Sequence, residues 1–329
     1  MPERRFQHVE DLRHAGLAAP DDTAMHFLWQ IVDEGVLGAS QHVSLGNQLL
    51  LHILDAVRDQ REALLRARLA ADFIARTRGR DTPVIGNSLA LLLAGLDGVE
   101  EPQRSDELRR RIESWGMAAA ARKQALVQGA VTQLAGTKGI MAFDYSSTVA
   151  AIVMALAKAD PALIVVVPES RSIAGGARYL EEFLPAGISV RYLPDAAIEY
   201  GLGYCDTVLF GVETLRADGS FLNTIGSRMI ARLGRENGTA IYGCTDLLKL
   251  DMQSFGEARP DPAVRDYDEV LLRGLAMPGL ENADTRAPEL EVIPAHLVTA
   301  LLTEHGPTPP RNIRALGQAT FGANARLQS

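Results

Sequence analysis

The spacing of apolar residues changes near residue 135 of this 329-residue chain. Before that point apolar residues recur at helical intervals, as Met25, Leu28 and Val32 do, and no stretch alternates as a half-buried strand would. The aspartates at 21–22 and Ser105 are suited to helix caps. Residues 1–135 are therefore expected to form a helical domain, with helices over 6–17, 40–56, 61–76, 84–96 and 106–134, and a further helix that Asp21 or Asp22 caps and that Gly35 and Gly38 end.

From residue 136 onward, apolar runs of strand length alternate with stretches of helical spacing. The predicted strands cover 140–143, 163–167, 188–193, 206–210 and 240–244, and helices are predicted over 147–157, 174–184 and 223–234. Ser146 or Ser147 is expected to cap the first of these helices. The run at 163–167 is apolar throughout, which is typical of a strand buried on both faces. The alternation predicts an α/β fold with an open, doubly wound sheet over residues 136–329.

Polar residues follow four of the predicted strands, namely Asp144, Arg171, Asp195 and Glu213. Because the carboxyl ends of parallel strands form the ligand crevice, we expect these side chains along one edge. Asp144 and Glu213 are the candidates for proton chemistry, since neighbouring carboxylates at a partly buried site have pKa values that move apart. The alternative is structural, with both carboxylates capping helices or pairing with Arg171 or Lys249. Asp195 is expected to cap a short helix.

The turn Glu169-Ser170-Arg171 leads into the helix predicted at 174–184. Backbone N–H groups at a helix start suit a phosphate, and Arg171 could add a bidentate contact. The glycines at 175–176 would let the backbone approach a ligand closely. The alternative interpretation is a helix cap beside a surface arginine.

Composition and missing motifs exclude several kinds of protein. The formal net charge of -8 opposes a general binder of nucleic acid. No strand is followed by Gly-x-Gly-x-x-Gly or a Walker loop, and neither the histidines nor Cys205 and Cys244 form a zinc motif, so no cofactor or metal is predicted. The cysteines are expected to be buried thiols. No apolar run approaches the ~20 residues that span a bilayer, and no signal region is seen, so a cytoplasmic protein is expected.

An ordered set of motifs in the second half of the chain is similar to that of a known family. The motifs are Asp144-Tyr145-Ser146-Ser147-Thr148-Val149, Glu169-Ser170-Arg171 with Gly176, Gly187-Ile188-x-Val190, Pro194-Asp195-x-Ala197, Gly211, Asp218-Gly219-Ser220, Asn223-x-Ile225-Gly226 and Thr303-Glu304-x-Gly306. Across residues 136–310 the chain resembles the family that unites ribose-1,5-bisphosphate isomerase, methylthioribose-1-phosphate isomerase and the alpha, beta and delta subunits of translation initiation factor 2B. The resemblance implies a helical N-terminal domain, a Rossmann-like C-terminal domain and a homodimer or larger homo-oligomer.

The chain departs from this family pattern at the centre of the implied site. The isomerase members rely on a cysteine after the first strand and an aspartate after the fourth, and these positions correspond to Asp144 and Glu213. The initiation-factor subunits usually carry a small residue such as serine at the first position. Two basic residues of the pattern are also replaced, by Leu37 before Gly38-Ala39 and by Thr224.

The resemblance implies that basic residues which contact phosphate are retained at Arg80, Arg171 and Lys249. Together with the strand-end residues, it predicts that substrate contacts come from Gly38, Ala39, Arg80, Tyr145, Ser146, Ser170, Arg171, Gly176, Asn223 and Lys249. A substrate with fewer phosphate groups would fit a site that lacks the two basic residues replaced by Leu37 and Thr224.

The leading hypothesis is an aldose–ketose isomerase for a sugar 1-phosphate, with Asp144 and Glu213 as its catalytic acid and base. A second hypothesis is a non-catalytic regulatory protein, similar to the initiation-factor subunits, that binds a sugar phosphate or nucleotide. A pure assembly subunit is a third. Turnover of pentose 1-phosphates distinguishes the first from the others, and a stabilising ligand that is not converted would favour the second.

Overall fold

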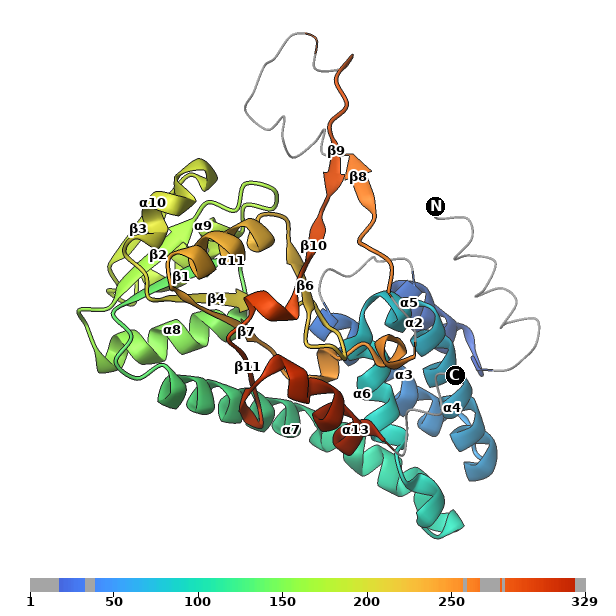
Figure 1. The fold of residues 1–329 in the computed structure, drawn as a ribbon. Helices are drawn as coiled ribbons and strands as arrows, with labels where there is room; N and C mark the ends of the chain where they lie inside the picture. The colour runs from blue at the N-terminus through green and yellow to red at the C-terminus, as the bar shows by residue number, and fades with distance from the viewer. Residues whose placement is uncertain (1–17, 33–38, 257–258, 267–278, 280–281, 323–329) are drawn as a thin grey trace. The chain divides into compact units, whose positions relative to one another are not determined.

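A computed structural model describes residues 18–32, 39–256, 259–266, 279 and 282–322 of the chain (Figure 1). The fold divides into two compact units. The first unit comprises residues 1–120, 248–253 and 318–329, and the second comprises 121–247 and 254–317. The sequence places a domain boundary at 135, whereas the units divide within the long helix α7 (Arg104–Gln133).

In the described residues of the N-terminal part of the chain, the first unit is built from helices. They are α2 (Asp22–Val32), α3 (Ala39–Ala56), α4 (Gln60–Arg76), α5 (Arg78–Asp81), α6 (Pro83–Leu93) and the first part of α7, with short 3₁₀ turns at Leu96–Gly98 and Glu101–Gln103. Their apolar faces meet in a core that includes fully buried Leu28, Leu49, Ile53, Ile74 and Ile85. The predicted N-terminal helical region is confirmed; its first predicted helix, 6–17, lies outside the described residues.

Side-chain caps explain where two of these helices begin. The Asp21 carboxylate accepts a hydrogen bond from the Ala24 amide at 2.9 Å, and Asp59 accepts one from Glu62 at 2.8 Å. The predicted cap at Ser105 is wrong. Helix α7 already begins at Arg104, and the Ser105 hydroxyl instead donates to the backbone oxygen of Gln60.

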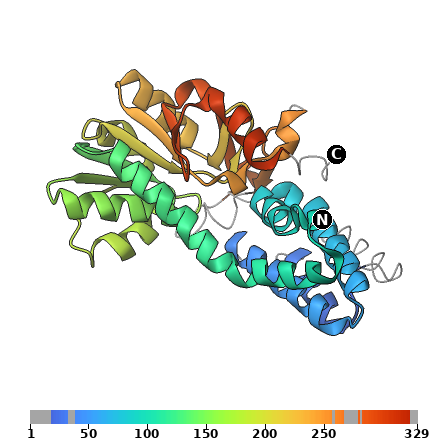
Figure 2. The same ribbon diagram turned by 90° about the horizontal axis from the view of Figure 1, so that it is seen from below.

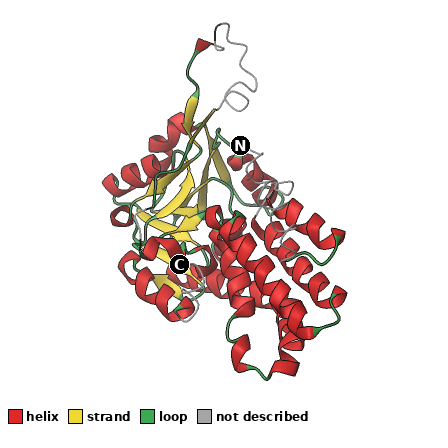
Figure 3. Ribbon diagram, turned by 90° about the vertical axis from the view of Figure 1, so that its right-hand side faces the viewer, coloured by secondary structure: helices red, strands yellow, loops and turns green. Residues whose placement is uncertain are grey.

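A seven-stranded sheet forms the centre of the second unit, with strand order β12-β11-β7-β4-β1-β2-β3. Neighbouring strands are parallel except β11 and β12, so the predicted mostly parallel sheet is confirmed. The strands are β1 (Gly139–Phe143), β2 (Ile164–Pro168), β3 (Val190–Leu193), β4 (Thr207–Gly211), β7 (Ala240–Cys244), β11 (Ala300–Thr303) and β12 (Gly306–Thr308). Figure 3 shows these strands gathered in one layer.

Helices cover both faces of this sheet. Ile140, Val165 and Leu209 pack on one face against the second part of α7, α8 (Ser147–Ala159) and α9 (Gly175–Phe183), and Figure 2 shows α7 and α8 running along that side. On the other face, α10 (Ile198–Leu202) and α11 (Ser227–Glu236) lie over the side chains of Met141, Val166, Val208 and Ile241. Because both faces are covered, every residue of β1 is buried, as its apolar sequence predicts.

A small antiparallel sheet, β10-β6-β5, adjoins the carboxyl end of β4. Its strands are β5 (Thr214–Leu215), β6 (Phe221–Thr224) and β10 (Leu290–Ile293). A separate two-stranded antiparallel sheet pairs β8 (Val264–Asp266) with β9 (Arg286–Pro288). The prediction that a helix begins at Asn223 is wrong, because Asn223 pairs with Glu291 in the sheet and α11 begins at Ser227. Helix α13 (Ile313–Phe321) follows the main sheet. No helix in the described ranges is long and apolar enough to cross a membrane.

Candidate active site

Asp144 lies directly after β1 and is buried, with 6% of its surface exposed. Its backbone has a φ of 58°, in the left-handed region that non-glycine residues rarely adopt. One carboxylate oxygen, Oδ1, accepts a hydrogen bond from the Tyr145 amide at 2.7 Å, and the other, Oδ2, accepts one from the Thr224 hydroxyl at 2.6 Å. Hydrogen bonds to both oxygens favour the ionised carboxylate.

The start of α9 packs against this carboxylate. A Cβ atom on Gly175 would lie 2.6 Å from Asp144 Oδ1 and 2.9 Å from the Tyr145 nitrogen, so the site requires glycine there. Among the described residues, the non-glycine positions with positive φ are Asp144, Ser170 and Ala174, at the ends of β1 and β2 and the start of α9. Backbone strain is thus concentrated at this edge of the sheet, as it often is at functional sites.

Ser146 follows β1 and packs against the end of the neighbouring strand β4. Its hydroxyl caps α8 by accepting a hydrogen bond from the Val149 amide at 3.4 Å, which confirms the predicted cap. Its own amide donates to the hydroxyl of Tyr179 at 3.1 Å. A Cβ on Gly211 would lie 2.7 Å from Ser146 Cβ, so the two strand ends meet closely here.

The Tyr145 side chain is engaged by α9. Its hydroxyl donates to Glu182, the Arg178 guanidinium lies 4.9 Å from its ring centroid, and the Tyr179 ring lies 5.3 Å away. Burial, followed by the hydrogen bond to Glu182, raises the pKa of Tyr145 to about 12. The phenol is therefore a protonated donor within the protein at neutral pH.

The turn after β2 differs from the predicted phosphate cradle. The amides of Ser170 and Arg171 both donate to the Asp195 carboxylate, each at 2.9 Å. These N–H groups are therefore already satisfied. The prediction that Asp195 caps a short helix is wrong, because Pro194 is the N-cap of the 3₁₀ turn Asp195–Ala197 and the Asp195 carboxylate instead holds the turn after β2. The Arg171 side chain is partly exposed and lies 3.7 Å from the Glu169 carboxylate. The Ser170 hydroxyl is fully buried and has no hydrogen-bond partner in the part of the chain that the structure describes.

The backbone at Gly176, predicted to approach a ligand closely, instead approaches the backbone at the end of β2. A Cβ there would lie 2.3 Å from the Pro168 carbonyl oxygen, at the end of β2. The Gly176 amide donates to the Glu169 carbonyl oxygen at 3.2 Å. Gly176 thus allows α9 to start directly beside β2.

Glu213 lies just beyond β4, the neighbour of β1 in the sheet, and its side chain is exposed. Its amide donates to the Leu222 carbonyl oxygen at 2.9 Å, which anchors the backbone to β6. Asp144 and Glu213 therefore occupy the carboxyl ends of adjacent strands, one buried and the other in contact with solvent.

A buried hydrogen-bond chain joins β6 to the start of α11. The Asn223 side-chain amide donates to the Ser227 hydroxyl at 3.1 Å, and that hydroxyl donates to the Thr224 carbonyl oxygen at 2.8 Å. Glu291 accepts hydrogen bonds from the amides of Gly226 and Arg228 at 2.7 and 2.9 Å. Sequence reasoning missed the roles of Ser227 and Glu291, and treated Thr224 only as a lost charge.

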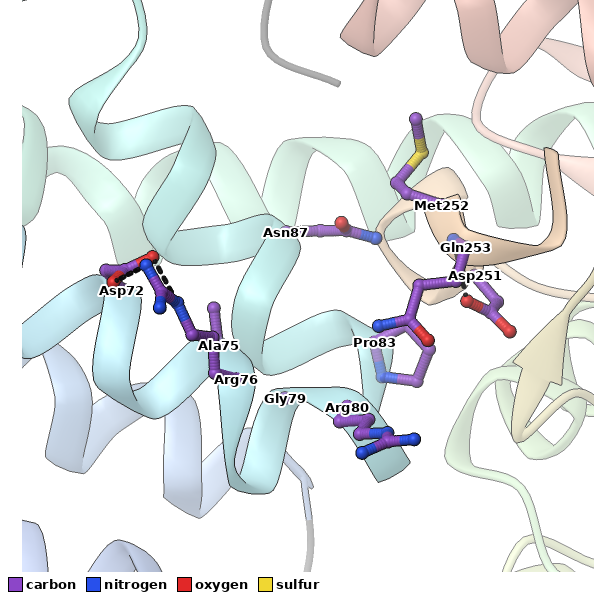
Figure 4. Close-up of a pocket in the computed structure, with 10 residues that line it drawn as sticks. All are labelled: Asp72, Ala75, Arg76, Gly79, Arg80, Pro83, Asn87, Asp251, Met252 and Gln253. Carbon is purple, nitrogen blue, oxygen red and sulfur yellow. Dashed lines mark hydrogen bonds and ion pairs between the residues drawn. The ribbon is translucent and has the colours of Figure 1, made fainter. Parts of the chain in front are cut away.

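The remaining predicted contacts belong to the first unit. Ala39 is the first residue of α3, Lys249 ends a 3₁₀ turn (Leu247–Lys249), and Gly38 lies outside the described residues. Arg80 lines a cavity of about 280 Å³, drawn in Figure 4. The other residues around this cavity are Asp72, Ala75, Arg76, Gly79, Pro83, Asn87, Asp251, Met252 and Gln253.

Hydrogen bonds shape this cavity. Arg76 pairs with Asp72 at 2.5 Å, and the Asn87 side-chain amide donates to the carbonyl oxygens of Leu248 and Leu250, each at 2.8 Å. No ion pair involving Arg80 is present among the side chains that the structure describes.

Neither cysteine takes the place of the cysteine on which the isomerase members of the family pattern rely. Cys244, at the end of β7, is buried, and burial raises the pKa of its thiol far above the usual range. Cys205 is half-buried, and burial raises the pKa of its thiol to about 12. Thiols in such surroundings stay protonated and inert at neutral pH.

Comparisons with known proteins extend these observations. The ribose 1,5-bisphosphate isomerase of Haloterrigena turkmenica is 28% identical over 279 residues, which cover 82% of this chain and 84% of that protein. The methylthioribose-1-phosphate isomerase of Pelotomaculum thermopropionicum is 30% identical over 193 residues, or 57% of this chain and 53% of that protein.

Solved structures share the fold. The Pyrococcus horikoshii translation initiation factor eIF-2B has a TM-score of 0.67 at 20% identity, covering 89% of this chain and 99% of that one. For eIF2B beta from Chaetomium thermophilum the TM-score is 0.67 at 18% identity, covering 95% of both chains. The sequence profile of the Initiation factor 2 subunit family matches residues 37–310. The chain therefore belongs to the Initiation factor 2 subunit family.

Proposed function

We propose that the protein is an aldose–ketose isomerase that acts on a sugar 1-phosphate, with Asp144 and Glu213 moving the protons. The observation that carries this proposal is the buried Asp144 carboxylate, held by two hydrogen bonds in a strained backbone conformation, one strand away from exposed Glu213. The relatives named as sugar-phosphate isomerases support the class of reaction.

The proposed reaction removes two protons from the sugar and adds two, so it needs a group that accepts protons and a group that supplies them. A base takes the proton from C2 of the sugar while the bond between C1 and the ring oxygen breaks and that oxygen receives a proton. The electron pair of the C2–H bond forms a C1=C2 double bond, which leaves an enol phosphate. Loss of the C2 hydroxyl proton to water and addition of a proton from Glu213 at C1 then yield the ketose phosphate. Protons balance over the cycle, and no oxidant is needed.

Asp144 is suited to the role of base in this scheme. Its hydrogen bonds from Tyr145 and Thr224 favour the ionised form, which is the form that accepts a proton. Glu213 is exposed, so it can exchange protons with water and deliver them to the ring oxygen and to C1.

The position of both carboxylates in the sheet supports a ligand site at this edge. In the Rossmann-like interpretation of the sheet, β1 lies between β2 and β4, and the strand order reverses there. Open α/β sheets bind ligands beyond the carboxyl ends of the strands at such a switch point. Asp144 follows β1 and Glu213 follows β4.

A substrate with few phosphate groups fits the charges near these strand ends. The turn amides after β2 and the amides at the start of α11 already bind Asp195 and Glu291. Arg171, whose exposed side chain lies 3.7 Å from the Glu169 carboxylate, is the cation beside Asp195 that we assign to a phosphate. Independently, we propose that Arg80 in the first unit binds a phosphate group, since it lines the cavity there.

Turnover of a defined panel tests the proposal. Wild type, Asp144→Asn and Glu213→Gln are incubated with methylthioribose 1-phosphate, 5-deoxyribose 1-phosphate and ribose 1,5-bisphosphate, and ketose formation is followed by ¹³C NMR. We expect at least one substrate to be converted by wild type and loss of conversion in both variants. A compound that stabilises the fold without conversion would instead favour the regulatory binding role, and no conversion of any substrate would overturn the proposal.

We further propose that the protein works as a cytoplasmic homodimer. A solved relative is a tetrameric eIF2B complex from Chaetomium thermophilum, which supports assembly through this fold. Light scattering coupled to gel filtration measures the mass in solution. Twice the 35.5 kDa of the chain is expected, and a monomer at micromolar concentration would contradict this assembly.

A further inference from the structure

Asp144 and Thr224 occupy two of the positions at which the chain departs from the family pattern, and their side chains are in direct contact. In the family pattern these positions carry a cysteine and a lysine, and here the Thr224 hydroxyl donates to Asp144 Oδ2 at 2.6 Å across 80 residues of sequence. We infer that the two replacements act together. Thr224 is a positioning residue, whose hydrogen bond fixes the carboxylate of Asp144 for proton transfer. This inference rests on the proposed isomerase function for its catalytic meaning, but the contact can be tested without turnover.

The surroundings leave the pair little freedom. Thr224 is only 3% exposed and Asp144 is 6% exposed, so water has little access to the hydrogen bond. The Tyr145 amide holds Oδ1, and the backbone of α9 at Gly175 closes that side of the carboxylate. Removal of the Thr224 hydroxyl would therefore leave Oδ2 in a buried place, with its hydrogen bond from β6 lost.

Thr224 is itself held in place. As the last residue of β6 it pairs with Leu290 of β10, and its carbonyl oxygen accepts the hydrogen bond from Ser227. Asn223 in turn donates to Ser227. The hydroxyl is thus presented to Asp144 from a rigid strand end, which is the arrangement a catalytic carboxylate requires for a fixed orientation.

The hydrogen bond has a predictable effect on titration. A donor to the ionised carboxylate lowers the pKa of Asp144, so loss of the donor raises that pKa. Titratable groups close to Asp144 on packed elements include Tyr145 on the same loop and Tyr179 on α9, and burial raises the pKa of both phenols, as it does that of the Cys244 thiol beside Tyr179. All three stay neutral in acid, so a titration below neutral pH reports on carboxylates.

Three variants distinguish a positioning role of the Thr224 hydroxyl from a general effect on the fold. Thr224→Val keeps the shape and removes the donor, whereas Thr224→Ser keeps the donor. Thr207→Val is the matched control, because Thr207 is a buried threonine at the opposite end of the sheet, whose hydroxyl lies 3.4 Å from that of Thr137. All three are compared with wild type for fold by circular dichroism before use.

The direct measurement is a ¹³C NMR titration of the aspartate carboxyl groups, in which the Asp144 signal is assigned by its absence from Asp144→Asn. We expect Thr224→Val to raise the pKa of Asp144 by on the order of one pH unit, which equals a tenfold change in the protonation equilibrium. Thr224→Ser and Thr207→Val should leave it unchanged. If Thr224→Val leaves the pKa of Asp144 unchanged, or if Thr207→Val moves it equally, the inference is wrong.

The kinetic measurement is the pH dependence of kcat/KM for any substrate that wild type converts. The acidic limb should move to higher pH in Thr224→Val and return in Thr224→Ser. If the NMR titration moves but no substrate is converted, the isomerase proposal fails while the pairing stands. If wild type converts substrate and Thr224→Val retains an unchanged acidic limb, the positioning role fails while the isomerase proposal stands.

Discussion

Gly175→Ala is the substitution whose effect follows most directly from the geometry of the site. The new Cβ would lie 2.6 Å from Asp144 Oδ1 and 2.9 Å from the Tyr145 nitrogen, closer than the 3.0 Å below which real Cβ contacts essentially never occur. Neither neighbour can move easily, because one is backbone and the other is a carboxylate held by Tyr145 and Thr224. The backbone at Gly175 is not left-handed, so the clash is steric and not conformational.

Relief of this clash requires α9 to shift or Asp144 to leave Thr224. Overpacking of this kind costs about 1–3 kcal/mol. That is a large part of the ~5–15 kcal/mol by which a typical domain is stable. Urea unfolding followed by circular dichroism measures the loss, and kcat/KM measured alongside should fall because the carboxylate is displaced.

The matched control is Gly129→Ala, in the helix α7 of the same unit. A Cβ there would lie 3.6 Å from the Gly306 Cα, an ordinary van der Waals contact. Alanine in a helix interior is about 0.5–1 kcal/mol more stable than glycine, so this variant should be neutral or stabilised. If Gly175→Ala unfolds at the same urea concentration as Gly129→Ala, the packing described around Asp144 is incorrect.

Three further predictions concern residues around the same edge. Ser170→Gly should be neutral or stabilising by up to ~1 kcal/mol in urea unfolding, because it removes both a left-handed serine and a buried hydroxyl with no partner among the described residues; clear destabilisation would contradict this. Tyr145 should titrate at about 12 in an ultraviolet pH titration in which Tyr145→Phe serves as the reference. The folding stability that its raised pKa contributes should be fully present below pH ~10 and be lost between about 10 and 12. A Tyr145 that titrates near 10 would be at odds with the Glu182 contact. Cys244 should react with a thiol reagent at neutral pH only after unfolding, and Cys205 only slowly; fast labelling of Cys244 in the folded protein would contradict its burial.

Periodicity and strand-end chemistry were sufficient to predict the main features of the fold. The strands β1, β2, β4 and β7 are recognisable as apolar runs, because strands covered on both faces need apolar residues at every position. The N-cap at Ser146 was predictable because capping depends on residues three apart. Strand β6 was missed because its stability comes from pairing with β10, far away in the sequence, and its polar end resembles a helix start.

The contacts within the site were not predictable from local pattern. A serine–arginine turn before a helix suggests open amides, but Asp195, 25 residues after Ser170, occupies them. Thr224 was recognised only as a missing charge, since nothing in the sequence brings it to Asp144 across 80 residues. Tertiary hydrogen bonds of this kind depend on strand order, which the apolar pattern leaves open.

The most direct test of the isomerase proposal compares ketose formation by wild type and Asp144→Asn on the pentose 1-phosphate panel, at equal concentrations of folded protein. Asparagine keeps the shape of the side chain but cannot accept the C2 proton as a base. The account predicts conversion by wild type and a roughly 100- to 10,000-fold slower rate for the variant, the range that general base catalysis contributes. Equal rates for the two proteins would contradict it, as would a wild type that converts no member of the panel.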